Sequence, residues 1–319
     1  MKKIGLALQG GGSHGAFTWG VLDRLLELED LEFSSISGTS AGAINAVVMA
    51  YGLHKGGPRL AKKLLDKLWY DISQSGKVFL NHNYFDFVNK FISPYQFNPL
   101  NLNPLKPIIN NLVDFDELQK SELRLFVCAT NVKTNRAKIF KTENMTANSV
   151  LASCCLPHIF QAVKIDDQYY WDGGYMANPP LSPLFDGIDI TDILLVKINS
   201  INIENLPRTS SEINDRVTEI SFNSSLMNEM RMIHLRNQFI KKGLDLGDWG
   251  NKEIFVHSIS GYDTLSKLEY STKMNVNLSF LLNLKAAGRE YADKWIKEEY
   301  QHVGKQSSFD VIKHFFDKF

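Results

Sequence analysis

Cysteine is scarce in this sequence, which has only three among 319 residues: Cys128, Cys154 and Cys155. The number is odd, two of the three are adjacent, and their spacing fits no zinc site. The pattern excludes a disulfide scaffold and favours buried or incidental thiols in a reducing compartment. A chain of this length can bury roughly three-quarters of its unfolded surface, so it needs no covalent cross-link.

Excess charge is also absent, because 35 basic residues balance 35 acidic ones and the formal net charge is zero. No basic block stands out, which argues against nucleic acid as a partner. The carboxylates are dispersed and the histidines lack the spacing of metal ligands. We therefore expect the protein to use neither a metal nor a cofactor.

Long apolar runs are missing too, and no stretch reaches the roughly 18 apolar residues of a membrane span. The run that follows Lys2 and Lys3 covers residues 4–8, whereas a secretory signal has an apolar core of about 7–15 residues. We interpret residues 4–8 as a buried strand. We expect a cytoplasmic chain whose contact with membranes, if it has one, is peripheral.

What the sequence does contain is a G-x-S-x-G pentapeptide from Gly38 to Gly42, with Ser40 at its centre. Apolar residues precede it, and a helix-like segment follows at residues 43–50. This context is typical of a nucleophile elbow, in which a serine lies on a tight strand-to-helix turn and flanking glycines avoid backbone clash. Such a turn exposes the Ser40 hydroxyl near the positive end of the following helix.

A glycine-rich segment at residues 10–15 joins the strand of residues 4–8 to a helical pattern at residues 16–28. Its bare backbone N–H groups favour an anion. The favoured interpretation is an oxyanion hole that serves Ser40. The simpler alternative is a tight turn that needs glycine only for its backbone geometry.

A third interpretation of this segment is a dinucleotide loop, because Gly10, Gly12 and Gly15 match G-x-G-x-x-G. That fingerprint expects an acidic residue about 20 residues further on, at the end of the second strand. The corresponding region leads into the elbow, and Glu32 comes before the strand. A P-loop is excluded because no Gly-Lys-Ser/Thr ends the segment.

Asp172, followed by Gly173 and Gly174, comes directly after the strand-like aromatic residues 169–171. An aspartate before two glycines is most often a turn residue. By itself this triplet therefore does not indicate catalysis.

Taken in order, the three motifs resemble those of the patatin-like phospholipase family. That family has a glycine-rich oxyanion loop after its first strand, then G-x-S-x-G, then D-G-G or D-G-A. With the pattern of apolar strands between helices, the resemblance predicts an α/β fold: a three-layer α/β/α sandwich with a mostly parallel central sheet. It covers at least residues 4–200. Further similar stretches are residues 128–132, 152–157, 178–180 and, less distinctively, 219–223.

The resemblance implies a serine acyl-ester hydrolase that acts on lipids, of the phospholipase A or lysophospholipase type. Ser40 would be the nucleophile and Asp172 the base, and an acyl-enzyme would form. Backbone N–H groups of Gly10, Gly11 and Gly12 would form the oxyanion hole. A free aspartate has a pKa near 3.9, so burial beside Trp171 must raise it for this role. The remaining motif positions are supporting glycines: Gly15, Gly38, Gly42, Gly173 and Gly174.

One position departs from the family pattern. The family loop often carries arginine or lysine where this chain has His14. A histidine is only partly charged near neutrality. If His14 contacts the substrate, recognition of phosphate is weaker or pH-dependent, or the substrate is not strictly a phospholipid. The simpler alternative is that His14 is a residue at the start of a helix and has no ligand role.

Three alternatives to the dyad hydrolase remain open. A Ser–His–Asp esterase would use His257, which follows a strand-like segment, with Ser40 and Asp172. A catalytically weak lipid-binding or scaffold protein would keep the motifs without turnover. A dinucleotide-binding oxidoreductase would use residues 10–15.

The chain is predicted to form a single patatin-like domain over residues 1–319, with a core at about 4–200 and a helical C-terminal elaboration at about 213–319. An aromatic-rich stretch at residues 78–102 is a candidate lid, acyl-chain wall or lipid-contact surface, although ordinary core packing explains it as well. The expected partner is a lipid or acyl-ester substrate, at a membrane or lipid aggregate.

Overall fold

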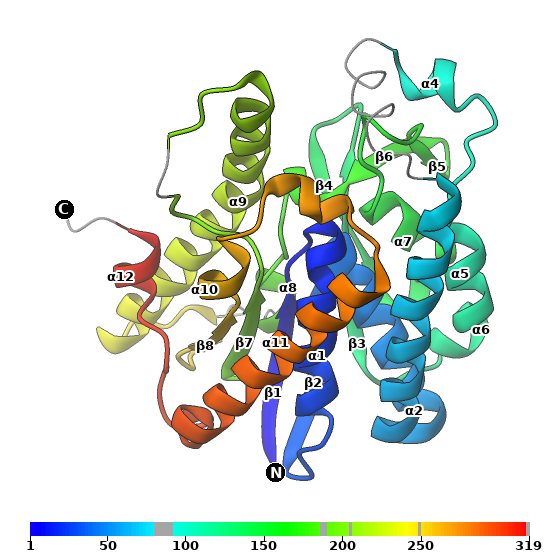
Figure 1. Cartoon of the computed structure of the whole chain (residues 1–319). Helices are drawn as coiled ribbons and strands as arrows, with labels where there is room; N and C mark the ends of the chain where they lie inside the picture. Colours follow the sequence, from blue (N-terminus) through cyan, green and yellow to red (C-terminus); the bar gives the residue numbers. More distant parts are fainter. Residues whose placement is uncertain (80–91, 186–189, 204–205, 248–249, 317–319) are drawn as a thin grey trace.

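The computed structural model describes residues 1–79, 92–185, 190–203, 206–247 and 250–316. Its centre is a sheet of eight strands in the order β5-β6-β3-β2-β1-β7-β8, with β4 paired to β3 (Figure 1). The strands are β1 (Lys2–Leu8), β2 (Leu31–Gly38), β3 (Arg124–Asn131), β4 (Arg136–Lys141), β5 (Val163–Ile165), β6 (Gln168–Asp172), β7 (Asp192–Lys197) and β8 (Phe255–Ser260).

The middle of the sheet is parallel, as the sequence predicts. The neighbouring strands β3, β2, β1, β7 and β8 all pair in parallel, whereas β4, β5 and β6 join antiparallel at the β3 side. Strand β4 was not anticipated, because most of its side chains are exposed and it lacks the apolar run of a buried strand. The fold is thus mixed α/β around a largely parallel sheet.

Helices cover both faces of this sheet. The helices are α1 (Gly15–Leu25), α2 (Ala41–Phe79), α4 (Pro94–Phe97), α5 (Leu105–Leu112), α6 (Phe115–Leu118), α7 (Ala147–Ser153), α8 (Ser182–Phe185), α9 (Ser210–Lys241), α10 (Tyr262–Leu265), α11 (Leu278–Glu298) and α12 (Val311–Phe315). Short 3-10 turns are η1 (Gly12–His14), η2 (Thr142–Asn144), η3 (Gly173–Tyr175), η5 (Tyr270–Met274) and η6 (Tyr300–His302).

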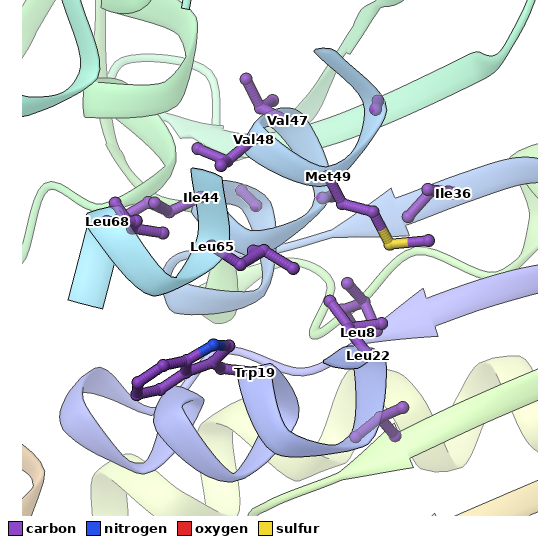
Figure 2. Packing of buried hydrophobic residues seen from close by; sticks show 14 of the residues in the cluster. Leu8, Trp19, Leu22, Ile36, Ile44, Val47, Val48, Met49, Leu65 and Leu68 are labelled. Atoms are coloured by element: carbon purple, nitrogen blue, oxygen red, sulfur yellow. The ribbon is translucent and has the colours of Figure 1, made fainter. Parts of the chain in front are cut away.

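The core is divided by the sheet into two apolar clusters, which makes the three layers. Leu194 and Val196 of β7 pack into the cluster that holds α1, α2 and α11. The alternate side chains Ile193 and Leu195 pack into the cluster that holds α8, α9 and α12. Figure 2 shows the first cluster, in which Leu8 of β1 lies among side chains from α1 and α2. Full burial of each such side chain contributes about 1.5–3 kcal/mol.

Helices α1 and α2 begin within two residues of the helical patterns that the sequence shows at residues 16–28 and 43–50. Helix α9 begins at Ser210, slightly before the start at about residue 213 that the sequence predicts for the helical C-terminal elaboration, because Thr209 and Glu212 form a capping box. Helix α2 consists of two segments that meet at a kink, where Gly56 and Gly57 have non-helical backbone angles and Pro58 follows. Within the described residues, no helix combines the length and the apolar character needed to cross a membrane.

The strand ends bring the sequence motifs together. Leu8, Gly38 and Val196 align in neighbouring parallel strands, so the segments that follow β1, β2 and β7 leave the sheet at the same edge. Strand β6 runs the other way and pairs Asp172 with Ala129, near the end of β3. The glycine-rich segment, the elbow and Asp172 therefore meet at one edge of the sheet.

Candidate active site

Ser40 occupies the turn between β2 and α2 and has a φ of 54°, a left-handed conformation that is uncommon for a residue with a side chain. A β-carbon on Gly38 would lie 2.6 Å from the carbonyl oxygen of Gly42, and one on Gly42 would lie 2.1 Å from that of Leu8. Both positions of the elbow therefore require glycine. The Ser40 backbone N–H donates to Ser153 Oγ at 2.9 Å, which helps to hold the turn.

Asp172 ends β6 and is completely buried. Its backbone is fixed on both sides: its N–H donates to the Cys155 carbonyl at 2.8 Å, and its carbonyl accepts from Thr130 Oγ1 at 2.7 Å. Oδ1 accepts the N–H of Gly174 at 2.8 Å, whereas Oδ2 has no hydrogen-bond partner among the described residues.

The electrostatics of Asp172 suit a base. Burial raises the pKa of its carboxyl from 3.8 to about 7, although the Gly174 N–H and the nearby Ser40 hydroxyl favour the anion and oppose that rise. The Ser40 side chain is thus close enough to influence the proton affinity of the carboxylate. Ser40 and Asp172, which are 132 positions apart in the sequence, lie together in the fold.

The two glycines after Asp172 are both sterically required. A β-carbon on Gly173 would lie 2.1 Å from the carbonyl oxygen of Cys128, and one on Gly174 would lie 2.6 Å from the ring of Phe222. Any larger residue would push the η3 turn away from β3 and shift the carboxylate.

The glycine-rich segment lies directly against the nucleophile, since a β-carbon on Gly10 would lie 2.7 Å from Ser40 Cβ. The sequence interpretation assigns the oxyanion to the N–H groups of Gly10, Gly11 and Gly12. The Gly10 N–H instead donates to Asn178 Oδ1 at 2.7 Å. The N–H groups of Gly11 and Gly12 have no protein acceptor within the described part of the chain, which leaves these two as the available donors.

Gly12 and Gly15 have packing roles. Gly12 has a φ of 59°, and a β-carbon there would lie 2.3 Å from the carbonyl oxygen of Lys273 in η5. A β-carbon on Gly15 would lie 2.7 Å from Ala41 Cβ, where α1 and α2 begin side by side. Because η5 covers Gly12 and β2 ends in the elbow, the loop does not offer the open setting that a dinucleotide pyrophosphate needs.

His14 is buried, and its Nε2 lies 2.7 Å from Thr272 Oγ1. Burial, together with the positive charge of Lys273, lowers the pKa of His14 to about 3. The ring is therefore neutral near pH 7 and does not offer a positive charge to a phosphate. The expected pH-dependent cation is not available at this position.

His257 lies away from Ser40. Its ring nitrogens are both engaged: Nε2 lies 2.9 Å from Asp192 Oδ1 and Nδ1 lies 2.9 Å from Ser308 Oγ. His257 lies on β8, which is the third strand from β2 in the sheet. The two strands are therefore about 14 Å apart. The triad of His257 with Ser40 and Asp172 is therefore wrong; this histidine instead links Ser308 to Asp192 of β7.

Several polar residues that support the site have no motif in the sequence. Asn178 and Ser153 fall in stretches that resemble the family, but nothing in their spacing assigns them a role. Asn199, whose Nδ2 donates to the Gly10 carbonyl at 2.6 Å, is one of several polar residues in the loop after β7. Only the tertiary structure brings Asn178 and Asn199 to the glycine-rich segment and Ser153 to the elbow.

Known proteins resemble this chain over much of its length. A cGAMP-activated phospholipase of Vibrio cholerae is 27% identical over 238 residues, which are 65% of this chain and 64% of that protein. Triacylglycerol lipase 4 of Saccharomyces cerevisiae is 27% identical over 225 residues, 62% of this chain and 24% of the lipase. The matches thus span less than two thirds of either relative.

A solved structure, VipD from Legionella pneumophila, aligns over 90% of this chain and 67% of its own, with 16% identity and a TM-score of 0.38. The family comparison is more direct, because the model of the patatin-like phospholipase family matches residues 6–185. That segment includes the glycine-rich loop, the elbow and the Asp172 motif. The chain belongs to the patatin-like phospholipase family.

Proposed function

We propose that this protein is a serine-dependent acyl-ester hydrolase that acts on lipids, of the phospholipase A or lysophospholipase type, through a dyad of Ser40 and Asp172. The observation that carries the proposal is a completely buried Asp172, with a pKa of about 7, close enough to a serine on a strained elbow for that serine to affect its pKa. A base with a pKa near the working pH can accept a proton from a serine hydroxyl without a histidine.

In the acylation step, Ser40 Oγ attacks the ester carbonyl carbon while Asp172 takes its proton. The carbonyl electron pair moves to oxygen, and the N–H groups of Gly11 and Gly12 stabilise the negative charge. When the tetrahedral intermediate collapses, the bond to the alcohol oxygen breaks. The proton on Asp172 passes to this leaving alcohol, and the acyl group stays on Ser40.

In the deacylation step, water attacks the acyl-Ser40 carbonyl and gives a proton to Asp172. The same two N–H groups hold the second oxyanion. Collapse releases the carboxylic acid, and Asp172 returns the proton to Ser40 Oγ. The cycle consumes one water for each ester and uses no other reactant.

The lipid nature of the substrate is supported by the relatives, because one is a phospholipase and another a triacylglycerol lipase. Apolar side chains on this chain also suit a lipid aggregate: Tyr95, Leu100 and Leu102 are more than half exposed. They lie near α4, which Figure 1 places at the upper end of the molecule with β5 and β6. Of the aromatic stretch at residues 78–102, residues 80–91 fall outside the described part.

The test is hydrolysis of a medium-chain nitrophenyl ester and of phosphatidylcholine vesicles by four proteins. Ser40→Ala and Asp172→Asn should lose at least 10³-fold in kcat, because each removes one half of the dyad. Ser224→Ala, on the exposed side of α9, should match the wild type. Full activity in Ser40→Ala would refute the proposal. Vesicle binding without turnover in the wild type would favour the lipid-binding alternative.

A further inference from the structure

We propose that Lys273 is a positioning residue that aims the Gly11 N–H into the oxyanion hole, acting through Asn199. The inference rests on the proposed function and names a residue far outside the family match, since Lys273 belongs to η5 and the match ends at residue 185. In Figure 1 the orange segment that contains η5 passes beside the beginning of α1, next to the glycine-rich loop.

The argument begins with one peptide unit. The carbonyl of Gly10 and the N–H of Gly11 belong to the same planar, trans peptide, so they point in opposite directions. Whatever fixes the Gly10 carbonyl therefore fixes the direction of the Gly11 N–H. Asn199 Nδ2 donates to the Gly10 carbonyl at 2.6 Å, a close hydrogen bond inside the buried core.

Asn199 can serve in this way only if its amide has the right orientation, nitrogen toward Gly10. Lys273 Nζ donates to Asn199 Oδ1 at 3.0 Å. Because an ammonium group is a donor only, it selects the orientation in which the amide oxygen faces Lys273 and the amide nitrogen faces Gly10. The backbone N–H of Asn199 is held in turn by Gln9 Oε1 at 3.0 Å.

The same series of contacts also transmits the electrostatic effect of the Lys273 charge to the Gly11 N–H. The ammonium group polarises the Asn199 amide, which strengthens its hydrogen bond to the Gly10 carbonyl, and that bond polarises the peptide whose N–H is offered to the oxyanion. The effect operates in a buried setting, because the Lys273 side chain is only 12% exposed. It is preorganised before substrate arrives, which is the condition for electrostatic stabilisation of a transition state.

Lys273 is itself held by several elements. Its Nζ pairs with Glu219 Oε1 of α9 at 3.3 Å. Its carbonyl oxygen packs on Gly12, and the preceding Thr272 bonds to His14 at 2.7 Å. The η5 turn therefore packs against the outer side of the glycine-rich segment. The Lys273 side chain extends beyond this segment and contacts Asn199.

The experiment measures kcat, KM and inhibitor affinity in Lys273→Met, Lys273→Arg and Asn199→Asp with the soluble nitrophenyl ester. Lys273→Met should lower kcat by at least tenfold with KM changed less than threefold, and Lys273→Arg should recover most of that loss. Asn199→Asp removes the donor to Gly10 while keeping a partner for Lys273, so it should lower kcat at least as much. Affinity for an alkyl boronic acid, which forms a tetrahedral anion on Ser40, should fall in parallel with kcat.

Lys285→Met provides a matched control, because Lys285 is also an ion-paired and largely buried lysine, and it should retain wild-type kcat. Wild-type kcat in either Lys273→Met or Asn199→Asp would overturn the inference. So would a loss that follows thermal stability and is not recovered by arginine. The proposed function is tested separately by Ser40→Ala, which should be inactive in the same assay whatever the Lys273 variants do.

Discussion

At the scale of the residue, the site depends on an aspartate placed where its charge is unfavourable. Burial raises the pKa of Asp172 to about 7, even though the Gly174 N–H and the Ser40 hydroxyl stabilise the anion. His14 responds oppositely to burial, because desolvation lowers the pKa of a cationic acid to about 3. The site therefore has a base that titrates near neutrality and a neighbouring histidine that does not.

This contrast predicts the pH dependence of the enzyme. Asp172 must be deprotonated to act as base, so kcat/KM should rise about tenfold per pH unit below pH 7 and level off above it. His14→Gln should leave the midpoint unchanged, since that ring is already neutral over this range. Initial rates from pH 5 to 9 on the soluble ester measure both profiles; a wild-type profile that is flat down to pH 5 would contradict the assignment.

At the level of secondary-structure elements, glycines allow the close packing of α1 against α11. A β-carbon on Gly288 would lie 2.0 Å from the Phe17 carbonyl oxygen, and one on Gly20 would lie 2.0 Å from that of Lys285. The backbones of the two helices approach closely at these points, so the usual preference of helices for alanine over glycine is reversed. This crossing matters for the site because α1 starts at the glycine-rich segment.

We therefore predict that Gly288→Ala lowers the free energy of unfolding by about 2–4 kcal/mol, because the helices must separate to admit a methyl group. Glu290→Ala, an exposed position on the same helix, should change it by less than about 0.5 kcal/mol. Urea denaturation followed by circular dichroism measures both. A stabilised Gly288→Ala would mean that the crossing is looser than its geometry indicates.

At the scale of the whole molecule, the candidate site draws on distant parts of the chain. Ser40 and Asp172 lie within the family match, whereas Asn199 and Lys273 come from β7 onward, beyond it. Because β7 pairs directly with β1, Asn199 follows its strand beside the glycine-rich loop, and η5 packs against that loop from outside the sheet. Burying Asp172 in this site is electrostatically unfavourable, and the penalty lowers the stability of the entire fold.

The burial of Asp172 makes the stability of the fold depend on pH. The folded state raises the pKa of Asp172 from 3.8 to about 7, so its contribution to stability is present at low pH and is lost as pH rises toward and through 7. Asp172→Asn cannot ionise and should avoid this loss. Its stability relative to wild type should increase by about 2–3 kcal/mol between pH 5 and pH 8. Urea titrations at the two pH values test this, and a pH-independent difference would count against it.

The local features of this protein could be predicted from its amino-acid sequence. Buried strands such as residues 4–8, the beginnings of α1 and α2 and the elbow around Ser40 follow from apolar patterns and from glycines typical of a tight strand-to-helix turn. The order of three motifs was sufficient to indicate the family and the pair Ser40 and Asp172. Strand β4 was missed because its exposed side chains give no periodic pattern.

Which polar groups contact one another became clear only from the folded chain. It joined His257 to Asp192 and Ser308 instead of to Ser40, and it gave the Gly10 N–H to Asn178. It also brought Lys273 to Asn199 at the glycine-rich segment. The physical reason is that strand order and register set these distances, and side chains tens or hundreds of positions apart carry no local pattern that records their contact.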